Sequence, residues 1–141
     1  MNRNLWKKTP QPCGIYEVFK HKVFGDMIAT MDTGNSAPNS VIHADEYKIN
    51  GKQMTITIKG NTITTPLVGT TEVGTGAGDE ERPIIKLDVE FNKQLYKKLS
   101  FTVDDRSGKS TLLINRDFLN DLNLYVNPSR EYMITAKEEV D

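Results

Sequence analysis

The sequence is poor in residues that hold small folds together through disulfide or metal bonds. Its 141 residues include one cysteine and two histidines. Cys13 has no second thiol for an internal disulfide, which favours an intracellular compartment. Cys13, His21 and His43 are together too few for a structural zinc site. We therefore expect a core that is stable through packing alone, and we predict neither a metal nor another cofactor.

Strong charge bias and long apolar runs are also missing. The formal net charge is -1 and the pI about 6.1, so the basic surface typical of nucleic-acid-binding proteins is absent. No apolar run has the length of a membrane span, and segment 1–12 lacks the apolar core of a signal peptide. We therefore expect no nucleic-acid or membrane partner. The expected location is cytoplasmic (the host cytoplasm or the virion if the chain is phage-encoded).

Most of the chain has patterns typical of β-strands. Asn50-Gly51 lies between two alternating runs, which is a strong hairpin signal, and Gly60-Asn61 adds a third strand to that meander. Another hairpin is predicted to turn at Asn92-Lys93, and the first one at Lys20-His21. The predicted strand segments are 14–19, 22–31, 46–59, 62–68, 83–91, 95–103, 110–114 and 131–136.

One helix is predicted near the C-terminus. Asn115 can serve as its N-cap, and Phe118, Leu119 and Leu122 recur at helical spacing before Asn123 ends it. The predicted fold is therefore all-β, a closed barrel with one short C-terminal helix. The expected organisation is an N-terminal arm (1–13), one domain (14–136) and an acidic tail (137–141).

An Asp-Thr-Gly sequence follows the second predicted strand. We expect Asp32 to lie in a tight turn, where Gly34 permits backbone conformations closed to other residues and the Thr33 hydroxyl fixes the loop. Aspartic proteases activate a water between two carboxylates that share a proton. A chain with one such loop must take its second Asp from a two-fold partner. The alternative is an ordinary turn with no catalytic role.

The segment 69–81 is rich in glycine and is expected to be the longest flexible part of the chain. It contains Gly74, Thr75, Gly76 and Gly78. No suitable helix follows, so a phosphate-binding loop is disfavoured. The remaining interpretations are an inert linker and a flap that closes over a substrate.

The order of these segments resembles the retropepsin-like aspartic proteases along nearly the whole chain. The hairpin, the Asp-Thr-Gly loop, the Gly-rich segment, a second hairpin and Leu-Leu-Ile-Asn-Arg at 112–116 follow the family pattern. Asn115 stands where the family has glycine, and this larger side chain argues against close packing of that strand beneath the loop. The resemblance implies a homodimer that cleaves peptides, with Asp32 as the catalytic residue.

A closer resemblance is to the bacterial and phage retropepsin-like proteins long labelled "ATP-dependent zinc proteases". These are related to the enzyme that trims glutamate tails added to a ribosomal protein. The matching segments are Met-Asp-Thr-Gly-Asn at 31–35, Ser-Val-Ile-His-Ala at 40–44, Arg-Pro at 82–83 and Asp-Arg-Ser at 105–107. Asn35 stands where the family has alanine. Neither zinc nor ATP finds support, because no phosphate-binding loop of the Gly-Lys-Ser/Thr type is present.

The same resemblance implies supporting roles for three residues. His43 would brace the active loop or contact the substrate, and Asp105 and Arg106 would form a pair that orders the loop beneath Asp32. Because arginine stays charged, it would keep Asp105 ionised, which argues against Asp105 as the second catalytic acid. Each of these residues also has a purely structural interpretation. His43 would then bond to nearby backbone, and Asp105 and Arg106 would form a local ion pair in a surface turn.

Two functions follow from these observations. The first is an aspartic endopeptidase whose substrate is a peptide or protein and whose Asp dyad forms across a homodimer. The second is a non-enzymatic structural or adaptor protein with the same fold, for instance in a phage particle.

Overall fold

The computed structural model describes residues 9–75, 78–105 and 110–136. No helix in these ranges is long and apolar enough to span a bilayer. The elements in chain order are β1 (Gln11–Gly14), β2 (Tyr16–His21), β3 (Gly25–Met31), β4 (Ser40–His43), β5 (Glu46–Asn50), β6 (Gln53–Ile58), β7 (Asn61–Pro66), β8 (Gly69–Thr75), β9 (Gly78–Phe91), β10 (Gln94–Asp104), β11 (Leu112–Ile114), α1 (Arg116–Asp121) and β12 (Leu124–Asn127).

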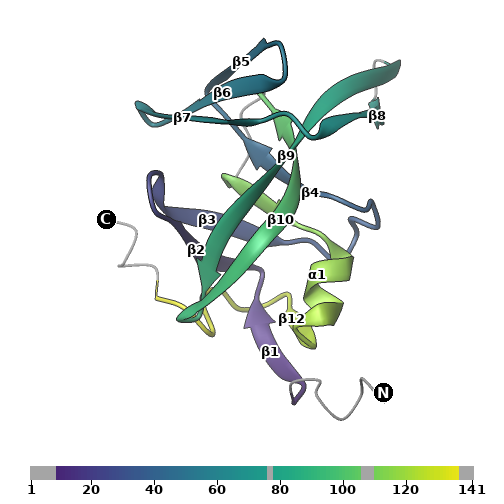
Figure 1. Ribbon diagram of the computed structural model, residues 1–141. Coiled ribbons are helices and arrows are strands. Elements are labelled where there is room, and N and C mark those ends of the chain that lie inside the picture. The colour runs from purple at the N-terminus through teal and green to yellow at the C-terminus, as the bar shows by residue number, and fades with distance from the viewer. Residues whose placement is uncertain (1–8, 76–77, 106–109, 137–141) are drawn as a thin grey trace, which may run out of the picture.

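Six strands close into a barrel. Their order is β10-β4-β11-β3-β2-β9, and pairing of β9 with β10 completes the ring. Strand β8 extends the sheet beyond β9, while β5, β6 and β7 form a separate three-stranded meander above the barrel (Figure 1). The predicted all-β closed barrel with one short C-terminal helix is confirmed.

The barrel interior is apolar because its strands alternate between inward and outward side chains. In β9, Ile85, Leu87 and Val89 are buried while the residues between them are exposed. Phe19 stacks on Phe91 inside the barrel, with ring centroids 4.6 Å apart. Helix α1 covers one end of this core with Phe118 and Leu119. Burial of these apolar side chains stabilises the fold without disulfide or metal bonds.

The first hairpin turns two residues later than predicted. Strand β2 continues through Lys20-His21, and the turn comprises residues 22–24. The His21 Nδ1 atom accepts hydrogen bonds from the backbone N–H groups of Val23 (3.1 Å) and Phe24 (3.2 Å). Gly25 then takes a φ of +74°, which favours glycine. The polar residues at 20–21 therefore mark the end of the strand, and the prediction of a turn there was wrong.

The Gly-rich segment is a hairpin and not a loop. Strand β8 pairs antiparallel with the first half of β9, from Gly69 opposite Ile84 to Thr75 opposite Gly78. Pairing between backbone groups forms this ladder, so it does not depend on large side chains. Residues 76–77, which include Gly76, lie outside the described residues.

Two strands near the ends of the described chain lie side by side. Strand β1 pairs in parallel with β12, from Gln11 opposite Leu124 to Gly14 opposite Asn127. Neither strand was predicted, and β1 spans the boundary expected between arm and domain. A Cβ atom on Gly14 would lie 2.7 Å from the backbone nitrogen of Tyr132, so only glycine permits this close approach.

The C-terminal segment 131–136 forms no strand, contrary to the prediction. Its N–H groups bond instead to the fully buried Glu17 carboxylate. Glu17 accepts from the backbone of Met133 (3.0 Å), Ile134 (3.2 Å) and Thr135 (2.9 Å), from the Thr135 hydroxyl (2.7 Å) and from the backbone of Gly14 (2.7 Å). One side chain thus satisfies donors that a neighbouring strand would otherwise have to satisfy.

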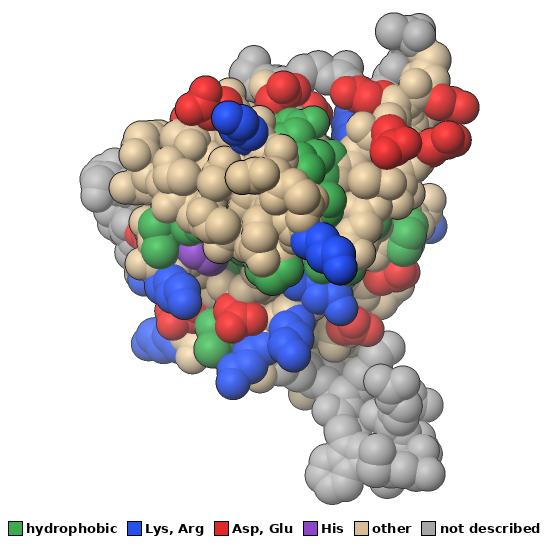
Figure 2. All heavy atoms as spheres, turned by 45° about the horizontal axis from the view of Figure 1, so that its top comes forward, with side chains coloured by type: hydrophobic (Ala, Val, Ile, Leu, Met, Phe, Trp, Pro, Cys, Tyr) green, Lys and Arg blue, Asp and Glu red, His purple; other side chains and the backbone are tan. Residues whose placement is uncertain are grey.

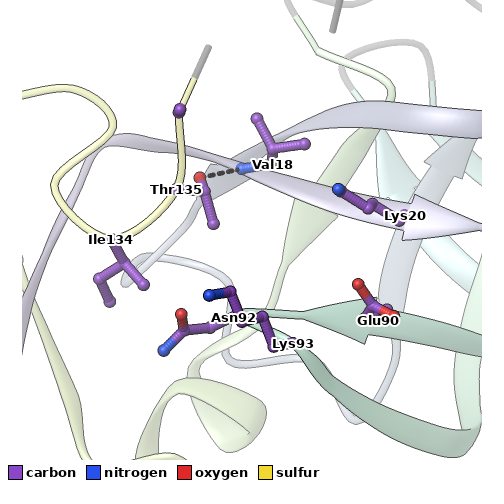
Figure 3. Close-up of a pocket in the computed structure, with 8 residues that line it drawn as sticks. Val18, Lys20, Glu90, Asn92, Lys93, Ile134 and Thr135 are labelled. Carbon is purple, nitrogen blue, oxygen red and sulfur yellow. Dashed lines mark hydrogen bonds between the residues drawn. The ribbon is translucent and has the colours of Figure 1, made fainter. Parts of the chain in front are cut away.

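The same segment walls a cavity on the outside of the barrel. The cavity measures about 320 Å³ and lies between β2, the β9–β10 turn and residues 134–136. Figure 3 shows the Val18 backbone N–H bonded to the Thr135 hydroxyl at the edge of this cavity. The segment is therefore bonded to β2 at both neighbours of Glu17. The Tyr132 N–H donates to the Tyr16 carbonyl, and the Val18 N–H donates to the Thr135 hydroxyl.

Cys13 is expected to be unreactive in the folded protein. Burial, followed by the charge of Glu17, raises the pKa of its thiol to about 11 from 9.0. Because the thiolate is the reactive form, alkylation at pH 8 should be about a hundredfold slower than in the unfolded chain. Labelling with iodoacetamide with and without guanidinium measures this ratio. Equal rates in both conditions would show that the thiol is accessible.

Candidate functional site

Strand β3 delivers Asp32 to one end of the barrel, in a loop bonded to β11. The Asp32 N–H donates to the carbonyl of Ile114 at 2.9 Å, since β11 runs parallel to β3. The carboxylate Oδ1 accepts from the Gly34 N–H at 3.0 Å, and the Asp32 carbonyl accepts from Asn35 at 3.1 Å. The loop is therefore a tight turn that fixes the Asp32 carboxylate, as the sequence predicted.

Gly34 favours the loop through space beside the carboxylate and not through its backbone conformation. Its φ lies outside the left-handed region, so the backbone there is open to other residues. A Cβ atom at this position would lie 3.3 Å from Asp32 Oδ1. The glycine thus gives the carboxylate room to bond to the backbone N–H of its own loop.

The start of α1 holds the other side of this loop. Arg116 donates from Nε to the Thr33 carbonyl at 2.9 Å and from its backbone N–H to the Asn35 carbonyl at 2.9 Å. Asn115 donates from Nδ2 to the Ala37 carbonyl at 2.9 Å. A strand and a helix start therefore fix the loop on two sides, which holds Asp32 in one position.

Asn115 strengthens the packing that it was expected to disturb. The residue is 4% exposed, and its backbone N–H donates to the Ser40 hydroxyl at 3.0 Å. Its Oδ1 accepts from the Phe118 N–H at 3.1 Å, the N-cap interaction that the sequence predicted. The expectation of looser packing was wrong, because the longer side chain replaces glycine with a cap and a loop contact.

Asn115→Ala is expected to lower the free energy of unfolding by about 2–3 kcal/mol. The change removes the helix cap and leaves the Ala37 carbonyl and the Phe118 N–H without their partner. Urea unfolding followed by circular dichroism measures the loss. Asn120→Ala, on the exposed side of α1, serves as control and should change stability by less than about 0.5 kcal/mol. Equal effects of the two substitutions would contradict the role of Asn115.

His43 lies far from Asp32. Strand β11 runs parallel to β3 and antiparallel to β4, so the end of β3 and the end of β4 lie at opposite ends of β11. By this register His43 lies level with position 111 and Asp32 level with position 115, a separation of four residues that corresponds to about 13 Å. The structure therefore does not bring His43 to the Asp32 loop.

His43 instead joins a buried charged cluster with Asp104 and Arg82. Its Nδ1 lies 2.9 Å from the carbonyl oxygen of Ser110, and its Nε2 lies 3.8 Å from Asp104 Oδ2. Arg82 approaches the same Asp104 oxygen at 3.6 Å and Glu80 at 3.5 Å. Sequence analysis did not identify Asp104 as a site residue. The β4–β10 register places it beside His43, and this register becomes visible only in the structure. These contacts tie the base of the β8–β9 hairpin to the barrel.

Asp105 is the one member of the expected Asp105–Arg106 pair that the structure describes. Its side chain is exposed, whereas that of Asp104 is 9% exposed. Arg106 lies outside the described residues. The buried carboxylate of this region is thus the last residue of β10, and Asp105 lies just beyond the strand.

The β8–β9 hairpin contains the three predicted flap positions that are described, Gly74, Thr75 and Gly78. Beyond Ile84, strand β9 leaves β10 and continues paired only with β8. Figure 1 shows this half projecting from the top of the barrel, beside the β5–β7 meander, while α1 lies lower in the view. Acidic side chains gather on the projecting part (Figure 2), where Glu72 lies directly opposite Glu81.

The arrangement provides one fixed carboxylate with a free oxygen. Within the described ranges, the hydrogen bonds and ion pairs connect Asp32 to no second carboxylate. The same residues contain no group of three or more His, Cys, Asp or Glu suited to a metal ion. Neither described cavity is lined by Asp32. An aspartic-protease dyad at Asp32 would therefore need its second carboxylate from outside these residues.

Comparison with known proteins identifies a similar fold. No protein-family model and no curated protein matches the sequence. The chain is similar to the crystal structure of Lpg0085, a protein of unknown function (DUF785) from Legionella pneumophila subsp. pneumophila str. Philadelphia 1. The TM-score is 0.71 at 20% identity, over 90% of this chain and 100% of that chain. At this identity the likeness establishes the fold alone.

Proposed function

We propose that the chain is an aspartic endopeptidase of the retropepsin type that acts as a homodimer. The observation that carries the proposal is the Asp32-Thr33-Gly34 loop, which β11 and α1 fix while one carboxylate oxygen of Asp32 keeps no protein partner among the described residues. A second copy related by a two-fold axis would supply the missing carboxylate. The two would share one proton and hold the attacking water.

The peptide substrate would lie between the paired Asp32 loops and the β8–β9 hairpins. The hairpin projects beyond the barrel, and the Arg82–Asp104 contact anchors its base. Such a position suits a lid that excludes water from the reacting bond. The expected location of the enzyme is the cytoplasm, or the host cytoplasm or the virion if the chain is phage-encoded.

Peptidase activity is expected to depend on protein concentration. Because each site needs Asp32 from two chains, the specific activity should fall in proportion to concentration once the dimer dissociates. Cleavage of a fluorogenic peptide mixture at serial dilutions, with sedimentation velocity at the same concentrations, measures this. Constant specific activity in a range where the protein is monomeric would contradict the dimeric site.

The rival function is a non-enzymatic structural or adaptor protein built on the same barrel. The rival predicts no cleavage at any concentration and no two-fold arrangement that brings two Asp32 carboxylates within hydrogen-bonding distance. A crystal structure of the associated protein would separate the two.

A further inference from the structure

A second cavity, of about 220 Å³, lies between the β2–β3 turn, strand β7 and the middle of β9. Its polar lining includes His21, Lys22, Thr65, Lys86 and Asp88. None of these residues belongs to the Asp32 loop or to the hairpin base. The cavity is therefore a separate candidate site, and a ligand bound there would be independent of the proposed peptidase activity.

His21 presents a hydrogen-bond donor that the protein does not use. Because Nδ1 accepts two backbone N–H groups, the neutral ring must have its proton on Nε2. Burial and then the charge of Lys22 lower the pKa of His21, against a weaker opposite effect of Asp88, so the ring is neutral at pH 7. The residue is 8% exposed, and within the described chain no acceptor bonds to Nε2–H.

Thr65 adds a second buried polar group to the same cavity. Its side chain points inward from β7 and the residue is 9% exposed, yet its hydroxyl forms no hydrogen bond among the described residues. Among the described residues, Arg82 Nε is the one fully buried side-chain polar atom without a partner, so the His21 and Thr65 groups reach solvent at the cavity. Water or a ligand can complete their hydrogen bonds there.

The charges around the cavity select an anion. Lys22 and Lys86 are exposed at its edge, and Asp88 is the one carboxylate in the lining. The Asp88 Oδ1 atom already accepts a hydrogen bond from the backbone N–H of Lys98 at 2.8 Å. Two lysines, a histidine with an unused N–H and a threonine thus line the cavity, together with one carboxylate that already accepts a hydrogen bond. Such a set of donors matches an oxyanion.

We propose that this cavity binds a phosphate group, as the free anion or as a monoester. A phosphate offers enough oxygens to accept from His21 Nε2, the Thr65 hydroxyl and the two lysines at once, whereas a carboxylate offers two oxygens in one plane. The cavity is several times the volume of one water, so it can admit a tetrahedral anion.

The test is a titration of the full chain with inorganic phosphate, at an ionic strength held constant with potassium chloride. The His21 ring resonances should shift to saturation in NMR spectra. The pKa of His21 should rise, because a bound anion stabilises the protonated ring. The thermal unfolding midpoint should increase with phosphate and not with chloride.

Matched variants locate the binding. Lys22→Gln and Lys86→Gln should each weaken phosphate affinity about tenfold. Lys48→Gln, an exposed lysine on β5, carries the same charge change and should have no effect. His21→Asn keeps a side-chain acceptor for the turn but removes the Nε2 donor, so it should fold and bind phosphate weakly.

Comparison ligands identify the source of the phosphate. Glycerol phosphate that binds within tenfold of inorganic phosphate identifies a monoester site, and weaker binding identifies a site for the free anion. The proposal is overturned if phosphate and chloride shift His21 alike, if Lys86→Gln and Lys48→Gln bind phosphate equally well, or if glutarate binds more tightly than phosphate.

Discussion

Replacing Asp32 with Asn is expected to lower kcat/KM for peptide hydrolysis by about 10⁴-fold or more. The amide can still accept the Gly34 N–H through its oxygen, so the loop and the fold should remain intact. It cannot take up the proton that the attacking water must lose, which removes the general base from both halves of the dimer. Cleavage of a fluorogenic peptide mixture, with thermal unfolding as the check on folding, measures the effect.

Asp105→Asn is the matched control, because it removes an exposed carboxylate from the same chain. It should leave kcat/KM within about twofold of the unmodified protein. When equal amounts of unmodified and Asp32→Asn chains exchange subunits, one dimer in about four contains two unmodified chains. The mixture should therefore show about a quarter of the activity of the same total amount of unmodified protein. Undiminished cleavage by Asp32→Asn would disprove the peptidase proposal. Loss of activity in Asp105→Asn would place the dyad within one chain.

Replacing Glu17 with Gln is expected to lower the free energy of unfolding by about 4–6 kcal/mol. One carboxylate oxygen becomes an amide NH₂ that faces N–H donors, so several of the buried bonds to Gly14 and residues 133–135 are lost together. Bonds to a carboxylate are stronger than those between neutral groups, and each buried donor without a partner adds its own cost. This loss is a large share of the stability of a typical domain.

Urea unfolding measures the loss, and amide exchange at residues 133–135 shows whether the C-terminal segment detaches first. Glu131→Gln changes an exposed carboxylate in the same segment and should alter stability by less than about 0.5 kcal/mol. A loss of under about 1 kcal/mol for Glu17→Gln would show that water replaces the carboxylate without penalty.

Local patterns were sufficient for the elements whose signals are local. Asn115 and the apolar residues behind it predicted α1 and its cap, and Asn50-Gly51 predicted the β5–β6 turn. The Asp32 turn was predicted because a strand, an Asp and a Gly follow one another directly. In each of these cases the residues that determine the structure are neighbours in the sequence.

The features that were missed depend on partners far away in the chain. Strand β1 contains Pro12 and Gly14, and only β12, more than a hundred residues later, gives it a ladder. Segment 131–136 has the composition of a strand, but Glu17 takes up its N–H groups. Such pairings depend on tertiary contacts, which override local propensity.

The candidate site shows the same limit at the level of single residues. Two aspartates follow each other at the end of β10, and only the strand register makes Asp104 the buried one. A shift of one residue moves a side chain to the other face of a strand, so the sequence alone could not choose. The distance between His43 and Asp32 was equally hidden, because it depends on the order in which β4 and β3 flank β11.

The Glu17 carboxylate also dictates when the protein can finish folding during its synthesis. Glu17 and its partner Thr135 are separated by 118 positions in the chain. A ribosome adds about 5–20 residues per second, so β2 waits about 6–24 s for the donors that let its carboxylate be buried. Throughout that interval the nascent barrel has an unmatched charge where its wall should close. Chains that stop before residue 133 should therefore remain open to proteases and chaperones, and protection should appear once residues 133–135 can reach Glu17.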